Sequence, residues 1–224
     1  MKIVAFSYDP LSDIVPAFEY FLHRTWPDCP HELVHVVNSG KALNVQSPIY
    51  RIDGGFGRRV REFVRQYCKD DEPILVILAD CLIISVNRRV IARAEDLMKR
   101  PEIAHIRLRP KPPPQLPYDD DFGRIRLGTR YSLSLQPGIW KAKVIHDLCR
   151  NKESPSATEI QGSSRTRTVG DKMLLCSRVG AMEFVNYYNH GKPWGSRWLR
   201  LNAPEEYWTD AAKGAKTGRG NPRS

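Results

Sequence analysis

Apolar residues in the first half of the chain follow two patterns that alternate along the sequence. Short apolar runs and one alternating segment predict strands at 3–6, 32–37, 74–78 and 103–108. Between them, apolar positions recur at helical spacing and predict helices from Asp13, over 56–67 and over about 87–99. The run at 74–78 has no polar alternation, which is typical of a central strand covered on both faces. This order predicts an α/β domain whose first half is a parallel, nucleotide-binding sheet.

The second half of the chain has a more mixed pattern. Residues 109–121 are rich in proline and acidic residues and predict an extended surface excursion. We expect paired strands at 124–127 and 131–136, a helix at 140–149, a polar loop at 151–170 and a last strand at 182–187. Residues 45–57 are expected to be a loop. The predicted fold class is therefore α/β, a mixed sheet flanked by helices in a single domain over 1–210.

Composition excludes several other classes of protein. Hydrophobic residues make up 41% of the 224 residues and charged residues 27%, which is ordinary for a globular chain. The longest apolar stretch, 74–84, is interrupted by Asp80, and a membrane span needs about 20 apolar residues. The first ten residues, MKIVAFSYDP, do not resemble a secretory leader. Five scattered cysteines without a close pair favour reduced thiols, so we expect a cytoplasmic protein.

Positive charge is concentrated towards the end of the chain. The formal net charge is +10, and residues 161–224 carry 11 Lys and Arg against 5 Asp and Glu. Residues 211–224 include four basic residues and no acidic one, and we expect them to form a basic flexible tail. Such a surplus fits a nucleic acid or another polyanion, because phosphate contacts release counterions. The alternative is that the charge only keeps the protein in solution.

Two carboxylates are candidates for chemistry. Asp80 follows the apolar strand 74–78, at the sheet edge where ligands of α/β proteins bind. A carboxylate there suits a divalent ion that bridges a diphosphate, although it also suits a cap on the following turn. Glu159 falls in the predicted polar loop, where it could be a general base or a solvated side chain. Ser7, Tyr8 and Asp9 end the first strand and would lie on the same edge as Asp80.

These segments together resemble a known family. The stretches are ILVILADCLII, SLQPGIW followed by a helix, TEIQGS and VNYYNHGKPW. They are similar to a group of small GT-A-fold glycosyltransferase-like proteins from phage and bacterial genomes, and the resemblance covers most of residues 1–195. It implies a GT-A-like nucleotide-binding sheet, with a donor-binding half over about 1–110 and an acceptor half over about 118–210. It also implies transfer of a hexosyl or pentosyl group from a nucleotide-sugar.

The resemblance implies a role for particular residues. Asp80 matches the second Asp of the family's strand-end motif and would lie by the donor diphosphate and its metal. Glu159 matches a loop Glu that would be the catalytic base or an acceptor-site carboxylate. Gln136 and Trp140 would line the acceptor side. The nucleoside would contact Ser7, Tyr8 and Asp9.

The sequence departs from the family pattern at two positions. Ala79 stands where the first Asp is usual, so a Mn²⁺ or Mg²⁺ ion would be bound weakly, not at all, or with another ligand such as His190. Without a metal, positively charged side chains must stabilise the leaving diphosphate, and the candidates are Arg58, Lys192 and Arg197. Thr158 precedes Glu159 where an aromatic residue is usual. Trp194, Trp198 and Trp208 suit either stacking on a sugar or base, or packing of a C-terminal cover.

The sequence thus predicts a glycosyltransferase that uses a nucleotide-sugar donor. For the acceptor we favour a hydroxylated pyrimidine base in phage-type DNA, because the C-terminal third is basic. One alternative keeps the fold and transfers the sugar to a surface glycan or a lipid-linked acceptor. Another is a non-catalytic nucleic-acid-binding protein on a degenerate transferase fold, which the loss of the first Asp would favour.

Overall fold

The apolar run at the start of the chain forms β1 (Lys2–Phe6), a central strand of the sheet in the computed structural model. The structure describes residues 1–7, 9–38, 43–189 and 192–214. Ile3 and Ala5 pack on one face of the sheet, and Val4 and Phe6 pack on the other. Because both faces are covered by protein, β1 has no polar position to alternate with its apolar ones.

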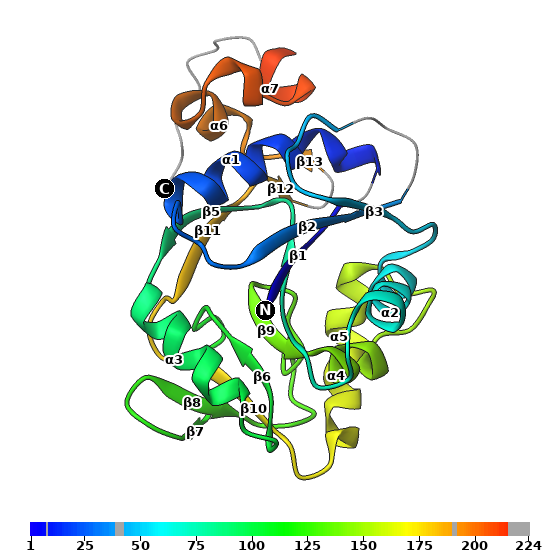
Figure 1. Cartoon of the computed structure of the whole chain (residues 1–224), viewed down its shortest axis with the longest axis vertical. Coiled ribbons are helices and arrows are strands. Elements are labelled where there is room, and N and C mark those ends of the chain that lie inside the picture. The colour runs from blue at the N-terminus through cyan, green and yellow to red at the C-terminus, as the bar shows by residue number, and fades with distance from the viewer. Residues whose placement is uncertain (8, 39–42, 190–191, 215–224) are drawn as a thin grey trace.

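Helices cover both faces of this sheet (Figure 1). The face of Ile3 packs against α1 and α3, and the face of Val4 packs against α2 and α4. The α-helices are α1 (Val15–Thr25), α2 (Phe56–Tyr67), α3 (Arg88–Met98), α4 (Ala142–Leu148), α5 (Pro155–Arg165), α6 (Ser196–Asn202) and α7 (Asp210–Gly214). Short 3-10 helices are η1 (Asp9–Ile14), η2 (Thr166–Val169) and η3 (Glu205–Tyr207).

Within the described residues, nine strands form the main sheet in the order β3-β2-β1-β4-β9-β6-β10-β8-β7. They are β1, β2 (Glu32–Val37), β3 (Ile49–Arg51), β4 (Pro73–Leu78), β6 (Ile103–Arg107), β7 (Leu116–Pro117), β8 (Phe122–Ile125), β9 (Gly138–Lys141) and β10 (Met173–Ser177). Two small pairs join β5 (Cys81–Val86) to β11 (Met182–Asn186), and β12 (Tyr188–Asn189) to β13 (Lys192–Pro193).

The direction of the strands fixes where a ligand site can form. β1 runs parallel to β2 and to β4, with Phe6 level with Val36 on one side and Leu78 on the other. β2 and β4 thus lie on opposite sides of β1. The C-terminal end of β1 is therefore a switch point of the sheet, which is where α/β proteins bind ligands. β9 is antiparallel to both of its neighbours, β4 and β6, so the sheet is mixed. The predicted α/β fold with a mixed sheet flanked by helices is confirmed.

The C-terminal segment packs on α1, at the top of the view in Figure 1. Tyr207 stacks on Tyr20 with ring centroids 4.4 Å apart, and Trp198 lies 5.0 Å from Phe21. The expected flexible tail is corrected at its start, because residues 211–214 belong to α7 and Ala212 is fully buried. The remaining tail residues lie outside the described part of the chain.

Several predicted elements in the second half were wrong. The segment 131–136 is not a strand; β8 pairs instead with β7 and β10. Trp140 does not begin a helix, since it lies in β9 and α4 begins two residues later. The second error arises because β9 is inserted between β4 and β6, and no local pattern records these distant partners.

The loops expected at 151–170 and 45–57 contain regular structure. The first includes α5, which Ser154 caps by accepting a hydrogen bond from the Ala157 amide, with Pro155 in its first turn. This start signal is present in the sequence, but the helix itself is rich in small polar residues and has a weak apolar face. The second includes β3, and the strands β5 and β10 were also missed. β3 has only three residues, and periodicity alone cannot assign short apolar runs such as those of β5 and β10 to a strand or a helix.

Candidate active site

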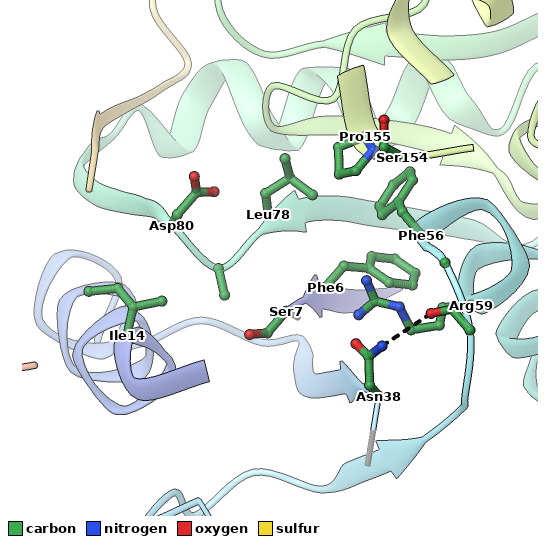
Figure 2. Close-up of a pocket in the computed structure, with 13 residues that line it drawn as sticks. Phe6, Ser7, Ile14, Asn38, Phe56, Arg59, Leu78, Asp80, Ser154 and Pro155 are labelled. Atoms are coloured by element: carbon green, nitrogen blue, oxygen red, sulfur yellow. Dashed lines mark hydrogen bonds between the residues drawn. The ribbon is translucent and has the colours of Figure 1, made fainter. Parts of the chain in front are cut away.

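A cavity of about 590 Å³ opens at the C-terminal ends of β1, β2 and β4 (Figure 2). Asp80 and Ile14 lie towards one end of it, Asn38 and Arg59 lie towards the other, and Ser7 lies between them. The residues that line it are Phe6, Ser7, Ile14, Asn38, Gly54, Gly55, Phe56, Arg59, Leu78, Ala79, Asp80, Ser154 and Pro155. The lining is mostly apolar with a few polar groups, which is typical of a small-molecule site.

The N-terminal ends of α2 and α5 meet at this cavity. The Gly57 amide in the first turn of α2 donates to the Glu153 carbonyl, 3.1 Å away and just before α5. A Cβ at Gly57 would overlap the Arg150 carbonyl oxygen, so only glycine allows this close approach. Gly54 has a φ of +109°, which also favours glycine. Two helix N-termini place partial positive charge beside one cavity.

A buried ion pair holds the start of α5 in place. Arg165 donates to the Glu153 carboxylate at 2.6 Å and to the Leu148 carbonyl at 2.8 Å. Glu153 also accepts a hydrogen bond from the Arg150 amide at 3.2 Å. The carboxylate is therefore paired with charge and hydrogen-bonded, as a buried charge must be. Ser154 and Pro155 form part of the cavity wall at the start of α5, and Arg165 at the end of the same helix holds this segment in place through Glu153.

Polar groups with unused hydrogen-bonding capacity face the cavity. Ser7 is only 7% exposed, and its hydroxyl has no hydrogen-bond partner among the residues that the structure describes. Asn38 donates from Nδ2 to the Gly54 carbonyl at 3.2 Å, while its buried Oδ1 has no partner in the described chain. The guanidinium of Arg59 is buried at the same end. Buried polar groups are normally satisfied, so the Ser7 hydroxyl and the Asn38 Oδ1 atom point to a bound ligand.

Asp80 lies at the opposite end, two residues after the end of β4. Burial raises the pKa of its carboxyl group to about 6. Its carbonyl accepts a hydrogen bond from the Tyr187 amide at 2.8 Å, which ties the C-terminal segment to this edge of the sheet. Beside it, the Tyr188 hydroxyl donates to Asp13 of η1 at 2.8 Å. A strongly shifted carboxyl group in a cavity is a candidate functional group.

Glu159 lies on α5, one turn after Pro155, and not in the loop that we expected. Its Oε1 accepts hydrogen bonds from the Leu135 amide at 2.8 Å and from the Ser134 hydroxyl at 3.2 Å. Burial raises the pKa of the Cys81 thiol, the charges of Asp80 and Glu159 raise it further, and Arg109 lowers it. The charges of both carboxylates therefore contribute to the raised pKa of the Cys81 thiol. Glu159 is not part of the cavity lining.

The other expected site residues have different positions. Trp140 is fully buried and stacks on His105 with ring centroids 3.6 Å apart, so its expected place on an acceptor surface is corrected. Gln136 is half-buried outside the cavity lining, and Arg58 and Lys192 are exposed. Arg197 is exposed on α6. Tyr8 and His190 lie outside the described residues, as does the side chain of Asp9.

The described residues do not make up a metal site. No group of three or more His, Cys, Asp and Glu side chains within them could hold an ion. Ala79 lines the cavity at the position where the proteins that the sequence resembles usually have an Asp. Divalent ions in such sites need several oxygen ligands, and Asp80 supplies one carboxylate. The acidic segment 119–121 is engaged elsewhere, because Asp121 pairs with Arg89 and Asp119 lies near Arg93.

Several residues of the cavity, among them Asn38 and Arg59, are not among the site residues expected from the sequence. Asn38 ends β2, so the rule that ligands bind beyond the C-terminal ends of strands would have found it. Arg59 lies three residues after Phe56 and four before Phe63, next to the apolar face of α2. Helical spacing therefore predicts that Arg59 is buried and that Arg58 faces solvent.

No protein-family model matches the sequence, and no curated protein matches it. Solved structures do match. TarS from S. aureus, residues 1–349, is 15% identical with a TM-score of 0.53, over 82% of this chain and 59% of that one. A UDP-glucose pyrophosphorylase complexed with UDP-glucose is 11% identical with a TM-score of 0.52, over 86% of this chain and 94% of that one. A longer TarS structure has a TM-score of 0.50, and this chain covers 39% of it.

These likenesses show the fold alone, because the identities are 11–15%. The chain has the GT-A-like fold of nucleotide-sugar transferases, as the resemblance in sequence implied. It spans only about three fifths of the shorter TarS chain that it matches. No helix in the described part of the chain is long and apolar enough to cross a membrane.

Proposed function

We propose that the protein is a glycosyltransferase that moves a sugar from a nucleotide-sugar donor to an acceptor hydroxyl. The observation that carries this proposal is the cavity at the switch point of the sheet, with the unsatisfied Ser7 and Asn38 side chains and the buried Arg59 inside it. A fold neighbour was solved with UDP-glucose, which makes a nucleotide-sugar the first ligand to test.

The distribution of groups suggests how the donor binds. Phe6 and Phe56 supply an apolar wall for a base, and Ser7 and Asn38 supply hydrogen bonds to its polar edge. Arg59 and the N-terminal end of α2 suit a negatively charged group. The donor sugar would then extend towards Asp80.

In the proposed reaction, the bond between the anomeric carbon and the phosphate oxygen breaks and a bond to the acceptor oxygen forms. Glu159 takes the proton of the acceptor hydroxyl, and the nucleoside diphosphate leaves with the electron pair of the broken bond. Both hydrogen bonds to Glu159 go to Oε1, which leaves Oε2 to accept the proton. We derive no step through a metal ion, since the described residues do not form its site. Positively charged protein groups carry the charge of the leaving group instead.

For the acceptor we keep the hydroxylated pyrimidine base of a nucleic acid as our proposal. It is supported by the excess of basic residues in the chain and by a surface described in the next subsection. Because a base inside a duplex is inaccessible, the acceptor would be single-stranded or extruded from the helix.

Donor binding is the first test, measured as a thermal shift and by calorimetry with UDP, with and without Mn²⁺. A ligand that binds only the native state raises the unfolding temperature. We expect UDP to stabilise the wild type and to bind Arg59→Met about 10-fold more weakly, since a hydrogen bond to a charged group is lost. Arg58→Met is the matched control: it changes the exposed neighbour on the same helix and should bind UDP like the wild type.

Turnover tests the catalytic part of the proposal. Glu159→Gln should lower transfer by about 100-fold or more, as loss of a general base does. Asp80→Asn should lower it as well, because the donor sugar extends towards Asp80. If both variants turn over every tested donor like the wild type, catalysis at this site is refuted. If no nucleoside diphosphate stabilises the folded wild type, the donor site itself is refuted.

A further inference from the structure

Four arginines gather around one turn of the chain, away from the cavity. They are Arg124 on β8, Arg126 just after it, Arg130 in the following turn and Arg167 on η2, and together we call them the arginine turn. All four are exposed. Arg124 and Arg126 flank the buried Ile125, so they point to the same outer side of the strand, with Cα atoms about 7 Å apart.

Contacts of Gly128 bring the fourth arginine to this turn. The Gly128 amide donates to the Thr166 hydroxyl at 2.7 Å, and Gly128 has a φ of +73°. The guanidinium of Arg167 lies so close to it that a Cβ at this position would overlap Nε. Arg167 therefore extends over the turn that carries Arg126 and Arg130.

The positive charge of this surface is not neutralised by the protein. Residues 122–146 contain no acidic residue, and neither do residues 160–170. None of the four guanidinium groups forms an ion pair with any residue that the structure describes. The contrast is α3, where Arg88, Arg89 and Arg93 are each paired with an Asp. Four like charges held together without counter-charges are typical of a surface for an anionic partner.

The turn is held rigidly, which favours binding. The buried Arg107 donates to the Tyr131 carbonyl at 3.0 Å, and Tyr131 has a φ of +61°. The Thr129 hydroxyl donates to the Arg126 carbonyl at 2.7 Å. The guanidinium of Arg130 lies 5.0 Å over the Tyr131 ring, so an aromatic face is present among the positive charges. Positive charge beside an aromatic ring suits a single nucleic-acid strand.

The same turn leads directly to Glu159. Ser132 bonds to the Ser163 carbonyl and to Thr166, the Leu133 amide donates to Ser163, and the Leu135 amide donates to Glu159. Segment 128–135 therefore runs along α5 and η2 with Arg167 at one end and Glu159 at the other. Glu159 and Arg167 are eight positions apart, or about 12 Å along a helix, which a stacked strand covers in three to four nucleotides at about 3.4 Å each.

We propose that the arginine turn binds the phosphate backbone of a single-stranded nucleic acid. The placement of one of its bases near Glu159 rests on the proposed function; the binding itself does not. The same strand would then be both the partner of this surface and the acceptor of the sugar.

The test measures binding of a fluorescein-labelled oligothymidylate of about 20 nucleotides to the full chain by anisotropy, over a series of salt concentrations. The test variant is Arg124→Ser/Arg126→Ser/Arg167→Ser. The matched control is Arg65→Ser/Arg88→Ser/Arg89→Ser, which removes the same charge from three exposed arginines that are already paired. Unfolding temperatures of both variants, with and without UDP, report whether each remains folded.

We expect the test variant to bind more weakly than the control by at least about 10-fold at low salt. The slope of log K against log salt should fall by about 2, since each lost phosphate contact on a single strand contributes about 0.7. A test variant that is folded and binds like the control overturns the proposal. A competition experiment gives a second contradicting outcome. The proposal is overturned if inorganic polyphosphate displaces the oligonucleotide from the wild type as readily as from the test variant. If the wild type does not bind UDP, the donor site is refuted. The comparison of oligonucleotide binding between the variants can still be interpreted in that case.

Discussion

Asp80 illustrates how the position of one carboxyl group changes its chemistry. It lies two residues after the end of the buried strand β4, and burial raises its pKa to about 6. At neutral pH the ionised carboxylate therefore lowers the free energy of unfolding. Such a destabilising residue is common at functional sites. Arg59, by contrast, places a buried positive charge at the other end of the same cavity.

The pH dependence of stability tests this cost. Because the folded pKa lies above the usual 3.8, the folded state binds the proton more tightly, and stability is lost as the pH rises through about 6. Asp80→Asn should match the wild type near pH 4 and exceed its free energy of unfolding at pH 7.5 by up to about 3 kcal/mol. Urea denaturation at both pH values measures this. The exposed Asp171→Asn is the control, and parallel curves for Asp80→Asn and the wild type would contradict the expectation.

At the scale of elements, the cavity depends on how closely α2 approaches the start of α5. The Gly57 amide bonds to the Glu153 carbonyl, and the Glu153 side chain is held by Arg165. The contact joins two segments about 100 residues apart and positions both helix N-termini beside one cavity. α5 itself was missed from the sequence, although its cap and its proline were visible.

Gly57→Ala should disturb this junction. The added methyl group would overlap the Arg150 carbonyl oxygen, and overpacking of this kind costs about 1–3 kcal/mol. The free energy of unfolding from urea titration measures the loss, and UDP affinity should fall with it. Gly55→Ala, two residues earlier, is the matched control, because its Cβ would lie at 3.4 Å from the nearest atom, the Asn151 carbonyl oxygen. Equal stability of the two variants would show that the contact is looser than described.

At the scale of the whole molecule, the C-terminal segment packs over α1 and reaches the edge of the cavity. Tyr187 is fully buried, and its hydroxyl bonds to Ser196 and Thr209, so the segment is tied to itself as well as to the domain. Of the three C-terminal tryptophans, Trp198 and Trp208 pack against the core, whereas Trp194 is 78% exposed. Trp198 and Trp208 therefore pack as part of a C-terminal cover, and Trp194 does not.

Two tryptophan variants separate packing from exposure. Trp198→Ala should lower the free energy of unfolding by about 2 kcal/mol, because its half-buried ring loses the contact with Phe21. Trp194→Ala should change it by less than about 0.5 kcal/mol, as surface substitutions do. Thermal and urea unfolding of both variants provide the measurement. A larger effect from Trp194 than from Trp198 would contradict this description of the cover.

Local patterns in the sequence determined the first half of the fold and the edge of the sheet where the cavity lies. Strands β1, β2 and β4 and the helices between them follow from apolar runs and helical spacing, since a face that is buried must be apolar wherever its partner comes from. The end of each strand is then known, and with it the positions of Ser7 and Asp80. The sequence also showed the excess of positive charge, because charge is a sum over residues and needs no structure.

Only the tertiary structure decided which of these residues act together. β9 is inserted between distant strands, which buries Trp140, and α5 packs against α2, which brings Ser154 to the cavity and Glu159 to a helix. Arg124 and Arg167 are 43 positions apart, and only the fold places them around one turn. The physical reason is the same in each case: these neighbours are joined by contacts between segments far apart in the chain, which leave no local pattern at either partner.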